Sequence, residues 1–200
     1  TRLLADLGAS VIKVEPPEGD PARQIGALHA RLNDGKEVRT ADFKSPQGIA
    51  QIVDWAAEAD VVVEGFRPGV AERLGLGPDV VLERNPRIVF ARMTGWGQDG
   101  PFAQRAGHDM NYISLTGLLH AIGRQGERPV PPLNLVGDFA GGSLYLVTGV
   151  LAALTHARES GQGQVVDAAI TDGVAHLLSM IPWEDVNVKV PSIPERPAPV

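Results

Sequence analysis

Short runs of apolar residues alternate with helical segments along the first half of the chain, and this alternation limits the possible folds more than any other feature. Strand-like runs lie at 11–15, 38–43, 61–64 and 88–93. The run at 61–64 is of the fully buried kind found in parallel sheets that are covered by helices. Strands separated by helices predict an α/β fold, doubly wound, with a mostly parallel, Rossmann-like sheet and flanking helices.

The helical segments carry start and stop signals. Ser45 followed by Pro46 predicts the N-cap and first turn of a helix that runs to about residue 57. The polar stretch 17–36 is expected to be irregular. Further helices are expected at 68–74, 80–84, 112–119, 142–157 and 171–180, and a further strand at 164–169.

The two ends of the chain suggest its domain organisation. A helix over residues 1–7, ended by Gly8, leads into the strand at 11–15. An open parallel sheet normally begins with a strand, so we expect that the first βα half-unit is missing from the sequence as given. We expect a large domain over 1–180, followed by a proline-rich tail over 181–200.

Composition excludes several classes of function. The 200 residues are 44% hydrophobic and 21% charged, which is typical of a globular domain. The net charge of −6 argues against general nucleic-acid binding. The chain has no cysteine, so disulfides, thiolate catalysis and zinc–thiolate sites are excluded. Because no apolar run approaches the roughly 20 residues of a membrane span, we expect a cytoplasmic protein without a membrane partner.

Two stretches place ionisable side chains beside glycine. Gly107 precedes His108 and Asp109, and Gly137 precedes Asp138. Glycine lets the backbone approach a ligand closely. One imidazole and two carboxylates can remove and return a proton at carbon, or attack a thioester.

Several ungapped motifs resemble the family III CoA-transferase superfamily of the CaiB/BaiF type. The resemblance covers about residues 1–180 and rests on the segments 5–9, 14–17, 41–45, 65–70, 73–75, 94–98 and 161–165. Residues 107–109 and 132–139 resemble its α-methylacyl-CoA racemase branch. His108 is the discriminating residue, because transferases of the family usually carry another residue there.

The resemblance implies a racemase that interconverts (R)- and (S)-2-methylacyl-CoA thioesters by two-base α-proton exchange through an enolate. It implies that His108 and Asp138 are the two catalytic acid/base groups. A histidine pKa near 6.5 suits this role, whereas an aspartate near 3.9 needs an enclosed, apolar site. Backbone N–H groups of a helix that opens around Gly141 are expected to stabilise the enolate. Asp109 matches the nucleophilic carboxylate of the transferases.

The resemblance also implies which residues surround CoA, the carrier part of the substrate. No further cofactor and no metal are expected. Pro16 stands where the family often has arginine, and Arg23 or Arg31 is expected to replace that contact. The implied CoA-binding residues are Ala41, Asp42, Phe43, Lys44, Gly65, Phe66, Arg67, Arg73, Gly107, Met110, Asn111, Tyr112, Gly137, Phe139, Ala140, Gly141 and Gly142.

The chain departs from the racemase pattern at its end. Such racemases are about twice as long, with a smaller middle domain that is absent here and a glutamate that orients the histidine. Glu184 and Glu195 do not match the context of that glutamate. Two alternatives therefore stay open, a CoA-transferase that uses Asp109 as nucleophile and an inactive, truncated acyl-CoA-binding homologue. The family also implies an interlocked homodimer.

Overall fold

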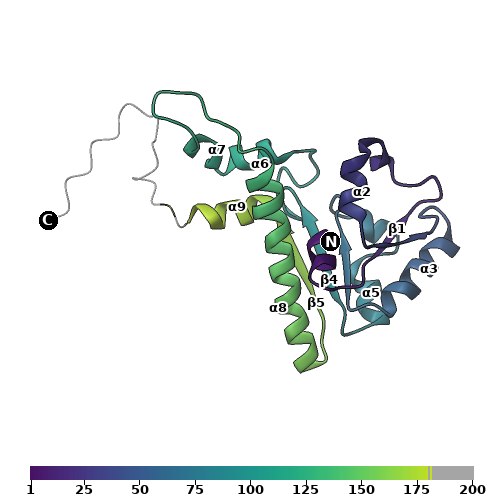
Figure 1. Ribbon diagram of the computed structural model, residues 1–200. Coiled ribbons are helices and arrows are strands. Elements are labelled where there is room, and N and C mark those ends of the chain that lie inside the picture. Colours follow the sequence, from purple (N-terminus) through teal and green to yellow (C-terminus); the bar gives the residue numbers. More distant parts are fainter. Residues whose placement is uncertain (180, 182–200) are drawn as a thin grey trace. The chain divides into compact units, whose positions relative to one another are not determined.

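The computed structural model describes residues 1–179 and 181 (Figure 1). Two compact units make up the chain. Unit 1 comprises residues 1–92 and 147–166, and unit 2 comprises residues 93–146 and those from 167 onward. The expected boundary at residue 180 stays a prediction, because the tail, with Glu184 and Glu195, lies outside the described residues.

Five strands form two sheets. β1 (Ile12–Glu15) pairs in parallel with β2 (Glu37–Thr40). β3 (Val61–Glu64) pairs in parallel with β4 (Val89–Thr94), and β5 (Gln164–Ala169) completes a sheet of order β3-β4-β5. The mixed α/β fold with parallel strands and flanking helices is confirmed, and the strands are divided between two sheets.

The core of unit 1 lies between helices and β4. Ile88 and Phe90 are fully buried, and they pack with Ala56 and Val81 from two helices. The Ser45 hydroxyl accepts the Gly48 N–H at 3.0 Å, which confirms the predicted N-cap. The helices of this unit before β4 include α1 (Arg2–Asp6), α3 (Pro46–Ala57), α4 (Val70–Arg73) and α5 (Pro78–Arg84).

The stretch 17–36, expected to be irregular, is helical over much of its length. The Asp20 carboxylate accepts the Ala22 N–H at 2.8 Å and caps the 3₁₀ helix η1 (Pro21–Ile25). The helix α2 (Ala27–Asn33) follows directly. Neither helix has a fully buried residue. The prediction was wrong because the Asp20 cap and Pro21 start η1, and α2 forms although it has no buried apolar stripe and no side-chain cap.

In unit 2, the single helix predicted over 112–119 is two helices. α6 (Asp109–Leu115) and α7 (Leu118–Ala121) are separated at Gly117, whose φ is +86°. A left-handed residue ends a helix, and glycine adopts that conformation without steric cost. α6 packs against α9 (Ile170–Leu178). The core of the unit consists of Tyr112, Ile113, Leu118, Ile170, Val174 and Leu178.

The helix predicted over 142–157 is longer and begins earlier. It starts as a π-helix, η2 (Leu135–Leu144), and continues as α8 (Tyr145–Ser160). Asp138 therefore lies within the helix, and the helix does not open around Gly141 as expected. Close packing against α9 requires glycine here, because a Cβ on Gly141 would lie 2.5 Å from Val174.

The combined helix Leu135–Ser160 has 26 residues and a mean hydropathy of 1.5. Among the described residues it is the one helix that is long and apolar enough to cross a membrane by length and composition alone. The expectation that no apolar segment approaches such a length was therefore wrong. A third of its most apolar window is buried within the structure, and core helices of globular proteins pass the same test.

Candidate active site

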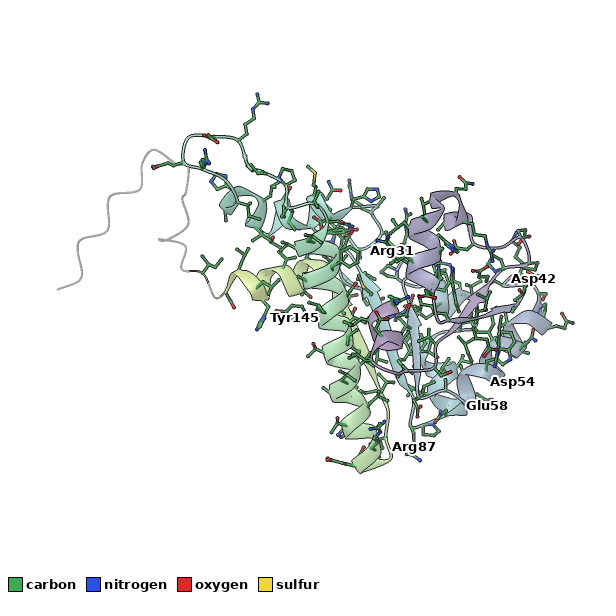
Figure 2. The ribbon with its side chains drawn as sticks, viewed as in Figure 1. Arg31, Asp42, Asp54, Glu58, Arg87 and Tyr145 are labelled. Carbon is green, nitrogen blue, oxygen red and sulfur yellow. The ribbon has the colours of Figure 1, made fainter. Side chains whose placement is uncertain are left out.

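A cleft of about 880 Å³ in unit 1 brings together three of the residues expected to bind CoA, namely Phe43, Lys44 and Arg73. Lys44 and Arg73 place two cations on its wall. Arg84, also on the wall, pairs with Asp54 at 2.8 Å; Figure 2 shows Asp54 on α3. The remaining lining residues are Ser45, Pro46, Ile49, Ala50, Val53, Leu74, Gly75 and Val80.

A tight turn before α3 positions the first wall of this cleft. The Asp42 carboxylate accepts the Lys44 N–H at 2.8 Å, and the Asp42 carbonyl accepts the Ser45 hydroxyl at 3.3 Å. Gly48 allows the helix to approach this turn, because a Cβ there would lie 2.1 Å from the Asp42 carbonyl oxygen. Aspartate commonly closes such turns through its own side chain. Asp42 and the buried Ala41 therefore shape the cleft without lining it.

A buried ion network lies beside the second wall of the cleft. Arg92 donates from Nε to Glu64 at 2.8 Å and from Nη1 to Glu72 at 2.9 Å. Glu64 also accepts the backbone N–H of Phe66 at 2.6 Å. Gly65, Phe66 and Arg67 form an exposed loop, called the Phe66 turn below, that this bond holds. Sequence reasoning gave the three network residues no role, although charged residues at the ends of two apolar strands are a detectable signal.

His108 and Asp109 begin helix α6 in unit 2. His108 is the N-cap, and its backbone N–H donates to the side chain of Asn111 at 2.9 Å. The His108 side chain is exposed, whereas Asp109 is only 5% exposed. The two neighbours therefore differ strongly in their access to a ligand.

The structure brings Asp109 together with Asp138. The Asp109 Oδ2 atom accepts the backbone N–H of Asp138 at 2.8 Å. The other oxygen, Oδ1, is buried and has no hydrogen-bond partner within the described part of the chain. Gly137 permits this approach, because a Cβ there would lie 2.3 Å from Asp109 Oδ2.

The surroundings of Asp138 favour its protonated form. Burial and the nearby charge of Asp109 raise the pKa of the Asp138 carboxyl, while a hydrogen bond with Asn134 and the field of His108 act in the opposite direction. Burial and Asp138 also raise the pKa of Tyr112. An aspartate with a raised pKa can donate as well as accept a proton nearer neutral pH.

Several other residues expected to bind CoA in unit 2 have packing roles. The ring of Tyr112 packs edge-on against Trp96, 4.7 Å between centroids, and a Cβ on Gly107 would strike both rings. Gly142 packs against Met93 and Ile170. Met110 and Phe139 are exposed, and Ala140 is partly buried. Ligand contact by any of these residues stays a prediction.

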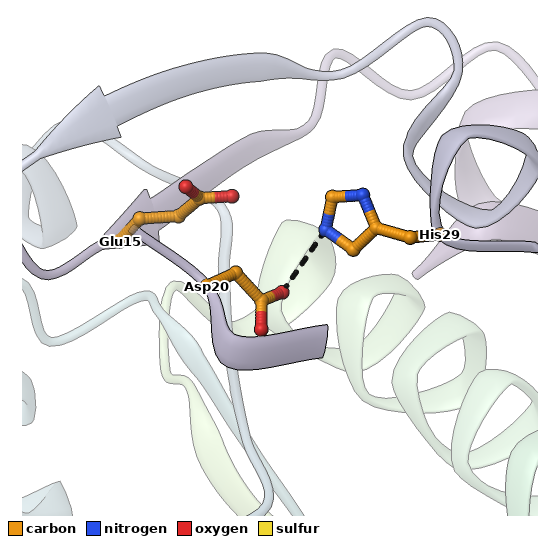
Figure 3. A group of neighbouring side chains, drawn as sticks. All are labelled: Glu15, Asp20 and His29. Carbon is orange, nitrogen blue, oxygen red and sulfur yellow. Dashed lines mark hydrogen bonds and ion pairs between the residues drawn. The ribbon is translucent and has the colours of Figure 1, made fainter. Parts of the chain in front are cut away.

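Among the described residues, Glu15, Asp20 and His29 form the one group with metal-ligand spacing (Figure 3). Lys13 already pairs with all three, at 2.9 Å from Glu15 Oε1 and 3.3 Å from His29 Nε2. Its hydrogen bond lowers the pKa of Asp20 to about 2. Arg23 pairs with Glu15 at 2.6 Å. The chain's own cations therefore neutralise this cluster.

Arg23 and Arg31 were the expected replacements for the family arginine near Pro16. Arg23 is bound to Glu15 through its guanidinium. Arg31 is exposed on α2, where Figure 2 labels it. Both side chains are exposed, and the guanidinium of Arg23 is already paired with Glu15.

Comparison with known proteins identifies the family. The model of the family described as CoA-transferase family III matches residues 1–196. The chain therefore belongs to CoA-transferase family III. A CAIB/BAIF family protein from Brucella suis has the same fold, with a TM-score of 0.81 at 33% identity over 90% of this chain and 50% of that chain.

Two curated relatives represent the two chemistries of the family. The chain is 43% identical over 184 residues to the human alpha-methylacyl-CoA racemase. This aligned region covers 91% of this chain and 46% of the human protein. It is 37% identical over 182 residues to the beta subunit of the succinyl-CoA–L-malate CoA-transferase of Chloroflexus aurantiacus. That aligned region covers 86% of this chain and 45% of the beta subunit. The chain spans about half the length of the curated relatives it matches.

Proposed function

We propose that this chain is part of an α-methylacyl-CoA racemase that interconverts (R)- and (S)-2-methylacyl-CoA. The observation that carries the proposal is the neighbourhood of His108 and Asp138, in which Asp138 has a raised pKa. One group takes the proton from the α-carbon, the electron pair moves to the thioester oxygen, and the resulting enolate takes a proton from the other group. The two groups return to their starting states by proton exchange with water.

The cleft in unit 1 supports acyl-CoA as the substrate class. Lys44 and Arg73 offer charge to phosphates, and the guanidinium of arginine can bind two phosphate oxygens at once. The aromatic ring of Phe43 and the aliphatic side chains of α3 add an apolar wall. The proposal adopts the interlocked homodimer implied by the family and retains the cytoplasmic location expected from the sequence.

Exchange of the α-proton tests the function directly. The full-length protein is incubated with (2R)-2-methylacyl-CoA in D₂O, and deuterium incorporation is followed by NMR. We expect His108→Ala and Asp138→Ala to abolish exchange. His156→Ala, on the exposed side of α8, is the matched control and should exchange at the wild-type rate. Absence of exchange in the wild-type protein would reject the racemase.

The second candidate is a CoA-transferase that uses Asp109 as its nucleophile. The unpartnered Oδ1 atom of Asp109 favours it, because a carboxylate oxygen free of hydrogen bonds is available to attack. Its burial opposes it, since attack requires contact between this oxygen and a thioester carbonyl. Trapping with hydroxylamine decides the question, because an acyl anhydride or a CoA thioester on Asp109 would yield a hydroxamate at that residue.

A further inference from the structure

Arg92 occupies an energetically costly buried position within β4. Its side chain and that of Glu64 are both nearly buried, and Glu72 is partly exposed. A buried ion pair often contributes no more stability than apolar residues of the same size. Its two bonds, at 2.8 and 2.9 Å, join residues 28 and 20 positions away in the sequence. Such a network is therefore better explained by what it holds in place.

Both carboxylates of the network connect to the cleft of unit 1. Glu64 uses its second oxygen to accept the Phe66 N–H at 2.6 Å. The Phe66 ring then packs edge-on against Phe43, which lines the cleft, with 6.5 Å between centroids. Glu72 directly precedes Arg73, whose side chain lines the same cleft.

We infer that Arg92 is a positioning residue for nucleotide binding, which holds the Phe66 turn through Glu64 and α4 through Glu72. Arg73 on the cleft wall, and the Phe66 ring that supports the lining residue Phe43, are thereby fixed relative to one another. The forked guanidinium is needed because it donates to two carboxylates from separate nitrogens, which a single ammonium group cannot do in the same geometry. The inference rests on the proposed acyl-CoA function, because CoA is the phosphate-bearing ligand assigned to the cleft.

The test is the affinity of the full-length protein for CoA, measured by calorimetry. Arg92→Lys keeps the positive charge, so the buried Glu64 retains a counter-ion. We expect the Kd for CoA to rise at least tenfold. The dependence of Kd on salt should become shallower, because fewer cation–phosphate pairs form. A purely structural role would lower the Tm without changing this salt dependence.

Arg2→Lys is the matched control. Arg2 also bridges two carboxylates, Asp6 at 2.8 Å and Asp34 at 3.1 Å, and none of the three lines the cleft. Its Kd should stay within twofold of wild type. Glu72→Gln, at the more exposed end of the network, keeps the test decisive if Arg92→Lys fails to fold, and should raise Kd at least threefold.

Each outcome has a clear meaning. A folded Arg92→Lys protein with a CoA Kd within twofold of wild type overturns the inference. An equal rise in the CoA Kd of Arg2→Lys also overturns it. If Arg92→Lys does not fold, an unchanged Kd in Glu72→Gln overturns it. A wild-type protein that binds CoA without exchanging the α-proton rejects the proposed racemase alone. A wild-type protein that does not bind CoA rejects both.

Discussion

The carboxylate of Asp109 fixes the backbone of Asp138 and raises the pKa of its side chain. The hydrogen bond from the Asp138 N–H to Asp109 Oδ2 is 2.8 Å long. The charge on Asp109, after burial, is the second cause of the raised pKa of Asp138. Asp109 therefore acts on Asp138, the acid of the proposed racemase, through both a hydrogen bond and its charge.

Asp109→Asn separates the hydrogen bond of Asp109 from the effect of its charge. The amide oxygen can still accept the Asp138 N–H, but it carries no charge. We expect the pKa of Asp138 to fall and activity to stay within about tenfold of wild type. In a pH profile of kcat/KM, the limb set by Asp138 should move to lower pH in both reaction directions. Loss of more than about a thousandfold would instead support Asp109 as a nucleophile.

Substitution of the cleft cations should weaken CoA binding. Lys44→Met and Arg73→Met each remove one charge that the proposal assigns to phosphate. A charge-assisted hydrogen bond contributes about 1.5–3 kcal/mol, so we expect the Kd for CoA to rise about 10- to 100-fold. Lys36→Met is the control, since Lys36 lies outside the cleft and bonds to the Thr1 hydroxyl. Equal effects in the control would show that the loss is not specific to the cleft.

Asp138→Asn should stabilise the protein at neutral pH. The folded-state pKa of Asp138 is raised, so its contribution to stability is present below the unfolded pKa of about 3.9 and is lost as pH rises through the folded pKa. Above that pH the ionised carboxylate is destabilising. We expect the variant to melt about 1–3 °C above wild type at pH 7, with a smaller difference near pH 3.

Melting curves measured at both pH values check this expectation. Asp54→Asn is the control, because the exposed Asp54 is paired with Arg84, so the substitution removes an ion pair and no buried charge. This control should show no increase in Tm at pH 7. An Asp138→Asn protein less stable than wild type at pH 7 would contradict the expectation that the ionised Asp138 carboxylate destabilises the folded protein.

Local signals in the sequence predicted the parts of the fold that local chemistry determines. The strand at 61–64 matches β3 to the residue, and Ser45 with Pro46 marked the start of α3 correctly. The start of η2 was missed, because the packing of Gly141 against α9 involves residues some thirty positions away. Periodicity within one segment does not reveal such a contact.

The candidate site shows the same division. The sequence motifs predicted His108, Asp109 and Asp138 as candidate catalytic residues. The structure adds that Asp109 is buried and accepts a hydrogen bond from the Asp138 backbone. The bonds of Arg92 join distant strands and a helix, so no local pattern predicted them. Which charged residues become partners is decided by tertiary packing.

The ion pairs of Lys13 should make unit 1 sensitive to acid. A hydrogen bond from Lys13 lowers the pKa of Asp20 from 3.8 to about 2. A lowered folded-state pKa contributes stability above the unfolded pKa, and this contribution is lost as pH falls through about 4 to 2. Lys13→Met should therefore cost roughly 1–2 kcal/mol at pH 7, after allowance for the partial exposure of both groups, and progressively less toward pH 2.

Urea unfolding at pH 7, 4 and 2.5 measures this difference. Lys44→Met is the control, because Lys44 is exposed on the cleft wall and its removal should change stability equally at each pH. A Lys13→Met deficit that stays constant from pH 7 to 2.5 would show that the lowered pKa of Asp20 does not contribute to stability.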